Sequence, residues 1–184
     1  MQNELQKEDL LYSQEGCRVY KTSDGELVLW EWEAEPACRL VHAIHNTLRR
    51  HALGTSYVGP FGLRGVLARG LTPLPVSVTV MAQPTAVSAV YRSGDGEPLT
   101  KEEAAALPGV GPGKMAMVED TALHTARTLR AYLAPAGITE LTLNLEFGTA
   151  VSGECQMQVV NPLRCAFGSL DFETLCGYLG GEKS

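Results

Sequence analysis

The sequence lacks several features that would assign it at once to a familiar class of protein. Its five cysteines include no Cys-x-x-Cys pair. An odd number of widely spaced cysteines argues against both a disulfide framework and a zinc ribbon. No apolar run approaches the length of a membrane span, and the polar, acidic N-terminus does not have the pattern of a signal peptide. We therefore expect a cytoplasmic protein with reduced thiols and no association with a membrane.

The common catalytic motifs are also missing. There is no Gly-x-Ser-x-Gly nucleophile elbow. The run 109–114 ends in Gly-Lys, but it lacks the first glycine and the final Ser or Thr of a phosphate-binding loop, so we predict a flexible connector there. His42, His45 and His51 are spaced by three and six residues, whereas a metal-binding helix places two histidines four residues apart. We expect these histidines at surface and boundary positions.

Negative charge is missing from one segment of an otherwise acidic chain. The whole sequence holds 21 Asp and Glu against 15 Lys and Arg, for a net charge of -6, which argues against a general nucleic-acid-binding protein. Residues 36–70 contain five arginines and no acidic residue. This segment either forms an anion-binding site or faces the acidic remainder of the protein. The candidate anion-binding residues are Arg39, Arg49, Arg64 and Arg69.

A length of 184 residues suits one domain, or two small lobes that share a core. Residues 10–33 have the pattern of β-hairpins, and 75–81 that of a further strand. Apolar residues at helical spacing predict one helix from Pro36 to about Gly54 and a second over 115–134. This mixed order favours an α+β fold over a doubly wound sheet. We expect a β-rich N-terminal lobe with one helix (1–80) and an α+β C-terminal lobe (81–184), joined in one compact unit.

The clearest strand in the sequence covers residues 141–147. Leu141, Leu143, Leu145 and Phe147 alternate with polar residues, so the leucines and the phenylalanine should face the core. Glu146 then lies on the opposite face. A carboxylate in that position can line a cleft and hold Mg²⁺ with a nucleotide, or it can simply be an exposed strand residue.

This strand belongs to a longer block that resembles a known family. The helix residues 122–134, the Ala-Gly-Ile turn at 136–138 and the Asn-Leu-Glu-Phe-Gly strand at 144–148 resemble the SAICAR synthetase (phosphoribosylaminoimidazole-succinocarboxamide synthase) family. Shorter matches occur in the same order at 10–21, 27–32, 73–80, 96–103 and 161–162. The resemblance implies an α+β fold with an N-terminal antiparallel-sheet lobe and a C-terminal ATP-grasp-like α+β lobe. It also implies a reaction in purine biosynthesis that joins a carboxylated aminoimidazole ribotide to aspartate with ATP and Mg²⁺.

Most positions that are charged in the family carry a different residue in this chain. By the resemblance, Glu146 is the family's strand glutamate. The two hairpin lysines fall on Glu15 and Cys17, and the loop after the second strand is nearly absent between Trp32 and Arg39. The remaining departures are Thr79 and Val80 for an Arg-Asn pair, Asn144 for a lysine, Gln158 and Val159 for an acidic pair, and Ala166 for an arginine, with Arg164 close by. An anion at Glu15 would repel phosphate groups, and a single carboxylate weakens a Mg²⁺ site.

Three hypotheses follow. The chain is a divergent homologue that no longer makes SAICAR, as a pseudoenzyme or a regulatory protein. Alternatively, it is an active ATP- and Mg²⁺-dependent carboxylate–amine ligase with a changed substrate, or a non-catalytic ligand-binding or interaction module. The nucleotide or metal candidates are Glu146, Gln158 and Asn144, with Glu146 as the metal ligand, and the substrate-side candidates are Glu97, Glu102, Thr79 and Arg164. The expected partners are a nucleotide or a small anionic metabolite and a second copy of the chain, with no nucleic acid.

Overall fold

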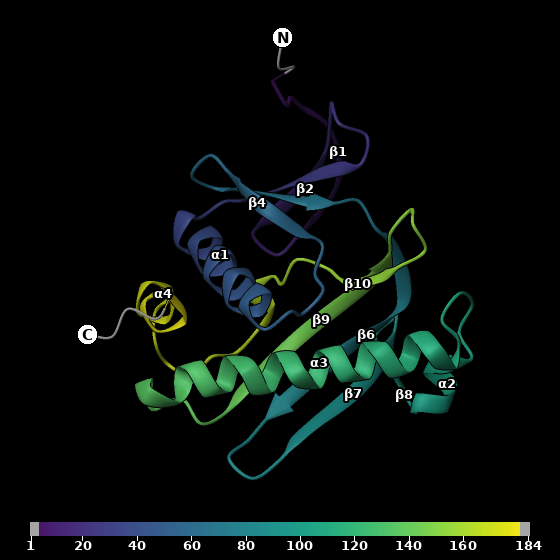
Figure 1. Ribbon diagram of the computed structural model, residues 1–184, viewed down its shortest axis with the longest axis vertical. Helices are drawn as coiled ribbons and strands as arrows, with labels where there is room; N and C mark the ends of the chain where they lie inside the picture. The colour runs from purple at the N-terminus through teal and green to yellow at the C-terminus, as the bar shows by residue number, and fades with distance from the viewer. Residues whose placement is uncertain (1–3, 181–184) are drawn as a thin grey trace.

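The computed structural model describes residues 4–180 and contains two five-stranded antiparallel sheets (Figure 1). The N-terminal sheet has the strand order β1-β2-β3-β5-β4. Its strands are β1 (Lys7–Gln14), β2 (Cys17–Thr22), β3 (Leu27–Trp32), β4 (Tyr57–Phe61) and β5 (Gly65–Arg69). The hairpins predicted over residues 10–33 are confirmed, because β1 pairs with β2 and β2 pairs with β3.

The second sheet has the order β10-β9-β6-β7-β8. Its strands are β6 (Thr72–Ala82), β7 (Val87–Ser93), β8 (Pro98–Leu99), β9 (Leu141–Thr149) and β10 (Cys155–Met157). The alternation predicted for 141–147 is confirmed, since the leucines and Phe147 are at most 3% exposed. They pack under α3 (Gly111–Leu133), which runs across one face of the sheet (Figure 1).

The first helix, α1 (Glu35–Arg50), contributes buried residues to the cores of both sheets. Its predicted apolar face is buried, but its residues serve two cores. Ala37 and Val41 pack with the N-terminal sheet, whereas Ile44 and Leu48 join the larger core of the second sheet. The C-terminal helix α4 (Phe172–Gly180) packs against α1. The remaining short elements are α2 (Lys101–Ala105), η1 (Ala134–Ala136) and η2 (Pro162–Arg164).

The structure differs from the sequence-based expectation at the start of α3. The run 109–114 is not a flexible connector, because Gly111, Pro112 and Gly113 form the first turn of α3. Proline is compatible with that turn, since it has no backbone N–H to leave unpaired. The N-terminal sheet ends with β5 at Arg69, and the second sheet begins with β6 at Thr72. Across residues 4–180, every helix is too short or too polar to span a membrane.

Candidate functional site

A cleft of about 560 Å³ lies on the face of the second sheet that points away from α3. Its walls come from β1, β6, β7 and β9 and from the segment 158–164. Strand alternation explains its polar floor, because leucines occupy one face of β9 while Asn144 and Glu146 occupy the other. Antiparallel pairing then sets Thr79 opposite Asn144 and Ser77 opposite Glu146.

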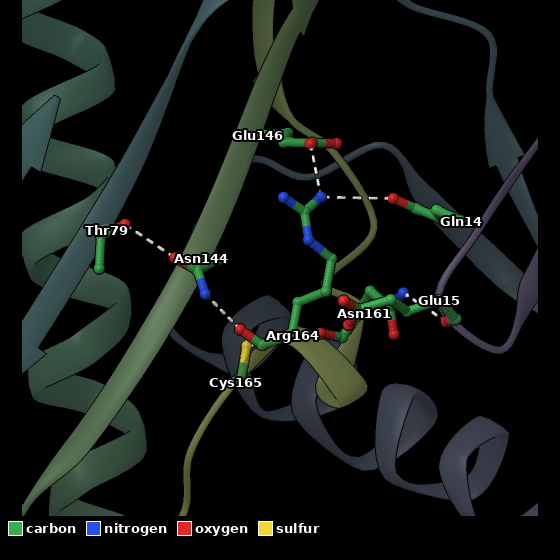
Figure 2. A network of polar contacts seen from close by, with 8 residues as sticks. All are labelled: Gln14, Glu15, Thr79, Asn144, Glu146, Asn161, Arg164 and Cys165. Atoms are coloured by element: carbon green, nitrogen blue, oxygen red, sulfur yellow. Dashed lines mark hydrogen bonds and ion pairs between the residues drawn. The ribbon is translucent and has the colours of Figure 1, made fainter. Parts of the chain in front are cut away.

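The carboxylate of Glu146 is paired with an arginine that enters from η2 (Figure 2). Arg164 Nη1 lies 2.7 Å from Glu146 Oε1 and 3.3 Å from Oε1 of Gln14 on β1. Both charged side chains remain partly in contact with solvent, at 40% exposed for Glu146 and 33% for Arg164. An exposed pair of this kind contributes little to stability. It does, however, cancel the charge of the one glutamate that lines the cleft among residues 4–180.

A chain of hydrogen bonds fixes the backbone that carries Arg164 (Figure 2). Thr79 Oγ1 donates to Asn144 Oδ1 at 2.7 Å, and Asn144 Nδ2 donates to the carbonyl oxygen of Arg164. Asn161 Nδ2 donates to the carbonyl oxygen of Glu15 at 3.1 Å, which connects this segment with the β1–β2 turn. Thr79 and Asn144 therefore position Arg164, and their polar atoms are already engaged.

Gln158 and Tyr12 complete the wall near Glu146. Gln158 is 9% exposed, and its backbone N–H donates to the carbonyl oxygen of Glu146 at 2.8 Å. Partial burial raises the pKa of the Tyr12 hydroxyl to about 12, and the charge of Glu146 adds to the effect. Tyr12 thus keeps its proton at neutral pH and can donate a hydrogen bond into the cleft.

The oxygen donors near Glu146 form a weak set for a divalent cation. One carboxylate is accompanied by the neutral amides of Asn144 and Gln158, and a guanidinium lies on the carboxylate. Mg²⁺ prefers carboxylates, phosphates and water in octahedral geometry. Over residues 4–180 no three side chains of His, Cys, Asp and Glu gather as a metal-binding group. As arranged, these side chains do not fit a resident Mg²⁺.

Five of the predicted site residues thus meet in one cleft: Glu146, Gln158, Asn144, Thr79 and Arg164. The two other acidic candidates lie elsewhere. Glu97 is exposed in the turn before β8, where its backbone N–H donates to Ser93 Oγ at 3.2 Å. Glu102 belongs to α2 and lines a separate hollow between α2 and α3.

The four arginines proposed as an anion site have separate partners on different elements, and none lines the cleft. Arg39 pairs with Glu173 at 3.6 Å, and Arg49 Nη2 donates to the carbonyl oxygen of Val58 at 3.0 Å. Arg64 Nη1 donates to the carbonyl oxygen of Glu33 at 3.2 Å, and Arg69 Nη1 to Gln156 Oε1 at 3.4 Å. The basic segment 36–70 therefore makes many contacts within the protein itself.

Sequence reasoning missed Arg92, Ser77, Gln14 and Tyr12, which also line the cleft. For Arg92 the sequence holds a weak signal. Ser88, Val90 and Arg92 occupy every second position of a β-rich run, so they are expected on one face of a strand. Which face of the sheet those positions occupy depends on pairing with β6, and one strand's pattern does not reveal this.

No family model and no curated protein sequence matches the chain. Solved structures do match. A SAICAR synthetase in complex with ADP superimposes with a TM-score of 0.78 at 16% identity, covering 96% of this chain and 99% of that one. The phosphoribosylaminoimidazole-succinocarboxamide synthase of Ehrlichia chaffeensis gives a TM-score of 0.75 at 9% identity, covering 83% and 81%. The SAICAR synthetase of Pyrococcus horikoshii gives 0.66 at 13% identity, covering 97% and 99%. At these identities the likeness establishes the fold, and the chain has the SAICAR synthetase-like α+β fold expected from its sequence.

Proposed function

We propose that this protein binds a small anionic ligand in the cleft, with a nucleotide as the leading candidate, and does not carry out a Mg²⁺-dependent ligase reaction. The observation that carries the proposal is the ion pair between Glu146 and Arg164 at 2.7 Å. In this reading the guanidinium takes the place that a metal ion would need, and the protein is a SAICAR synthetase-like pseudoenzyme or regulatory protein.

The chemistry of the ligase reaction explains why this pair matters. Activation of a carboxylate by phosphoryl transfer requires cations that stabilise the charge on the transferred phosphoryl group. A metal ion at Glu146 would first have to displace Arg164, which also bonds to Gln14. Moreover, Glu15 in the neighbouring β1–β2 turn supplies negative charge where the family resemblance implies lysine. These features disfavour metal-assisted phosphoryl transfer while leaving two cleft arginines, Arg92 and Arg164.

A nucleotide is the leading ligand because the ADP complex is among the structures that share the fold over nearly the whole chain. In this protein such a ligand would meet the arginines and the Tyr12 hydroxyl of the cleft. This binding would need no Mg²⁺.

An active ligase with a changed substrate is the second candidate. The exposure of the Arg164 side chain favours it, because a side chain that is 33% exposed can leave Glu146 without disturbing the core. Glu146 could then bind Mg²⁺ together with the phosphates of ATP.

The substitution Glu146→Gln separates the two candidates by the sign of its effect. If the carboxylate only neutralises Arg164, its loss frees a guanidinium, and ATP and ADP should bind as tightly as before or more tightly. If the carboxylate is a metal ligand, the same substitution should weaken binding of the Mg²⁺–ATP complex. Calorimetric titration with each nucleotide, once with Mg²⁺ and once with EDTA, measures both effects.

The matched control is Glu173→Gln, which removes a carboxylate from an arginine pair outside the cleft. We expect the wild-type protein to bind nucleotide equally with and without Mg²⁺ and to release no ADP from ATP above background. Binding that requires Mg²⁺ and is weakened by Glu146→Gln, but not by Glu173→Gln, would refute the proposal in favour of an active metal site.

A further inference from the structure

The floor of the cleft contains a row of three polar side chains, one from each of three neighbouring strands. Ser77 on β6 pairs with Glu146 on β9 at one side and with Arg92 on β7 at the other. Side chains at paired positions point to the same face of a sheet, and all three line the cleft. Neighbouring strands are roughly 4.8 Å apart, so the backbones of Glu146 and Arg92 are separated by about 10 Å.

The two arginines of the cleft differ in how far their charge is already compensated. Arg164 is paired with Glu146. Within residues 4–180, by contrast, Arg92 has no carboxylate partner, and the hydrogen bond found for it runs from Nη1 to the carbonyl oxygen of Gly96 at 3.1 Å. A carbonyl oxygen positions a guanidinium without cancelling its charge, and the other N–H groups of the fork stay available. Arg92 is also only partly exposed, which limits screening by solvent.

The hydroxyl group of Ser77, next to Arg92, is the second donor in this part of the cleft. In the described part of the chain Ser77 Oγ has no hydrogen-bond partner, unlike Thr79 Oγ1, which donates to Asn144. Ser77 therefore presents a free O–H donor beside a guanidinium with free N–H donors. Pro75, two positions earlier on β6, gives the cleft an apolar wall next to them.

We propose that Arg92 and Ser77 form a binding site for an oxyanion, a phosphate or a carboxylate group, on the ligand that occupies the cleft. A planar guanidinium binds such a group through two parallel N–H···O bonds, and a serine hydroxyl supplies a third donor from the side. This inference rests on the proposed function in one respect only, that the cleft binds an anionic ligand. The inference adds that Arg92 and Ser77 are the residues that bind the anionic group of the ligand. That group would lie against β7, on the side of Ser77 that faces away from Glu146.

The experiment titrates the full chain with inorganic phosphate and, separately, with malonate, at constant ionic strength kept by chloride. Binding is followed by backbone amide chemical shifts in NMR spectra. For the wild-type protein we expect saturable shifts at residues of β6 and β7 with at least one of the two probes. A response to phosphate alone or to malonate alone identifies the anion that the site prefers.

The variants are Arg92→Gln and Ser77→Ala, and the control is Arg127→Gln on the exposed side of α3. Loss of a charged bidentate contact should weaken binding on the order of tenfold or more in Arg92→Gln. Loss of the single hydroxyl should weaken it several-fold in Ser77→Ala, while Arg127→Gln binds as the wild type does. Ser77→Ala removes only the hydroxyl oxygen that faces the cleft and should leave the strand intact, so it tests the site even if Arg92→Gln does not fold.

The outcomes keep this inference separate from the proposed function. Equal affinity in the wild type and in both cleft variants, or equal losses in Arg92→Gln and Arg127→Gln, would overturn the oxyanion site. The nucleotide experiment with and without Mg²⁺ could still succeed in that case. Conversely, a Mg²⁺-dependent turnover of ATP would refute the proposed function, while anion binding that depends on Arg92 and Ser77 would stand.

Discussion

Because His45 on α1 is buried, we predict that the folded protein loses stability in weak acid. Its ring is 0% exposed and stacks on Tyr57, with ring centroids 5.0 Å apart. Nε2 accepts a hydrogen bond from the backbone N–H of Val160 at 2.9 Å, so the neutral ring carries its proton on Nδ1, 3.3 Å from Thr55 Oγ1. Burial, with smaller contributions from nearby positive charge, lowers the pKa of His45 to about 3.

The size of this loss in folding free energy follows from proton linkage. In the unfolded chain His45 has its ordinary pKa of 6.5, so as the pH falls below 6.5 the unfolded state binds a proton that the folded state excludes. Each pH unit between the two pKa values then costs about 1.4 kcal/mol of folding free energy. Between pH 7 and pH 5 this amounts to about 2 kcal/mol. Carboxylates with lowered pKa values, such as Glu119, lose their contribution mainly below pH 4.5 and hardly affect this window.

Urea-induced unfolding of the wild type and of His45→Gln at pH 7.0 and pH 5.0 tests this reasoning. Glutamine offers an acceptor for the Val160 N–H but does not titrate. The variant should therefore be less stable at pH 7 and should lose about 2 kcal/mol less than the wild type on going to pH 5. His124→Gln, on the exposed side of α3, should keep the wild-type pH dependence. An equal pH dependence in the wild type and His45→Gln would refute the reasoning.

Three further predictions concern the second sheet and the helices that pack against it. Gly148→Ala on β9 should destabilise the protein by roughly 1–3 kcal/mol in urea unfolding, because a Cβ there would lie 2.6 Å from Leu71 Cβ and 2.8 Å from the Thr72 carbonyl oxygen; unchanged stability would contradict that close packing. Leu145→Ala, with a side chain 1% exposed under α3, should cost about 2–5 kcal/mol in the same assay. Thr100→Ala removes the capping box of α2 and should cost about 1 kcal/mol, with Thr100→Ser as the control that retains it.

Much of the fold was predictable because it depends on local periodicity. The alternation around Leu143 and the four-and-three spacing along α1 are properties of consecutive residues, and both place the buried faces correctly. The first turn of α3 was not predicted, since glycine and proline disfavour helix in general. Proline is nevertheless accepted at the start of a helix, where four N–H groups lack partners in any case.

The candidate site was predictable only in part, for a different reason. Glu146 and Asn144 could be assigned to one face from their own strand, and Thr79 and Arg164 came from the family resemblance. The partner of Glu146 was not foreseeable, because Arg164 is 18 residues away and reaches the carboxylate from η2. His45 was expected at a boundary and is fully buried, because its acceptor role toward Val160 depends on a segment 115 residues further along the chain.

These contacts show where the unevenly distributed positive charges of the sequence lie relative to the cleft. Four of the five arginines of segment 36–70 are bound to carbonyl oxygens, an amide and one carboxylate outside the cleft, so they do not supply its positive charge. The cations of the cleft come instead from Arg164, outside that segment, and from Arg92 on β7. Within residues 4–180 the charge of Arg164 is compensated by Glu146 and that of Arg92 is not, so we expect an anion to be attracted to Arg92. The choice between binding and catalysis therefore depends on the Glu146–Arg164 pair, which Glu146→Gln tests, whereas the net charge of -6 does not bear on it.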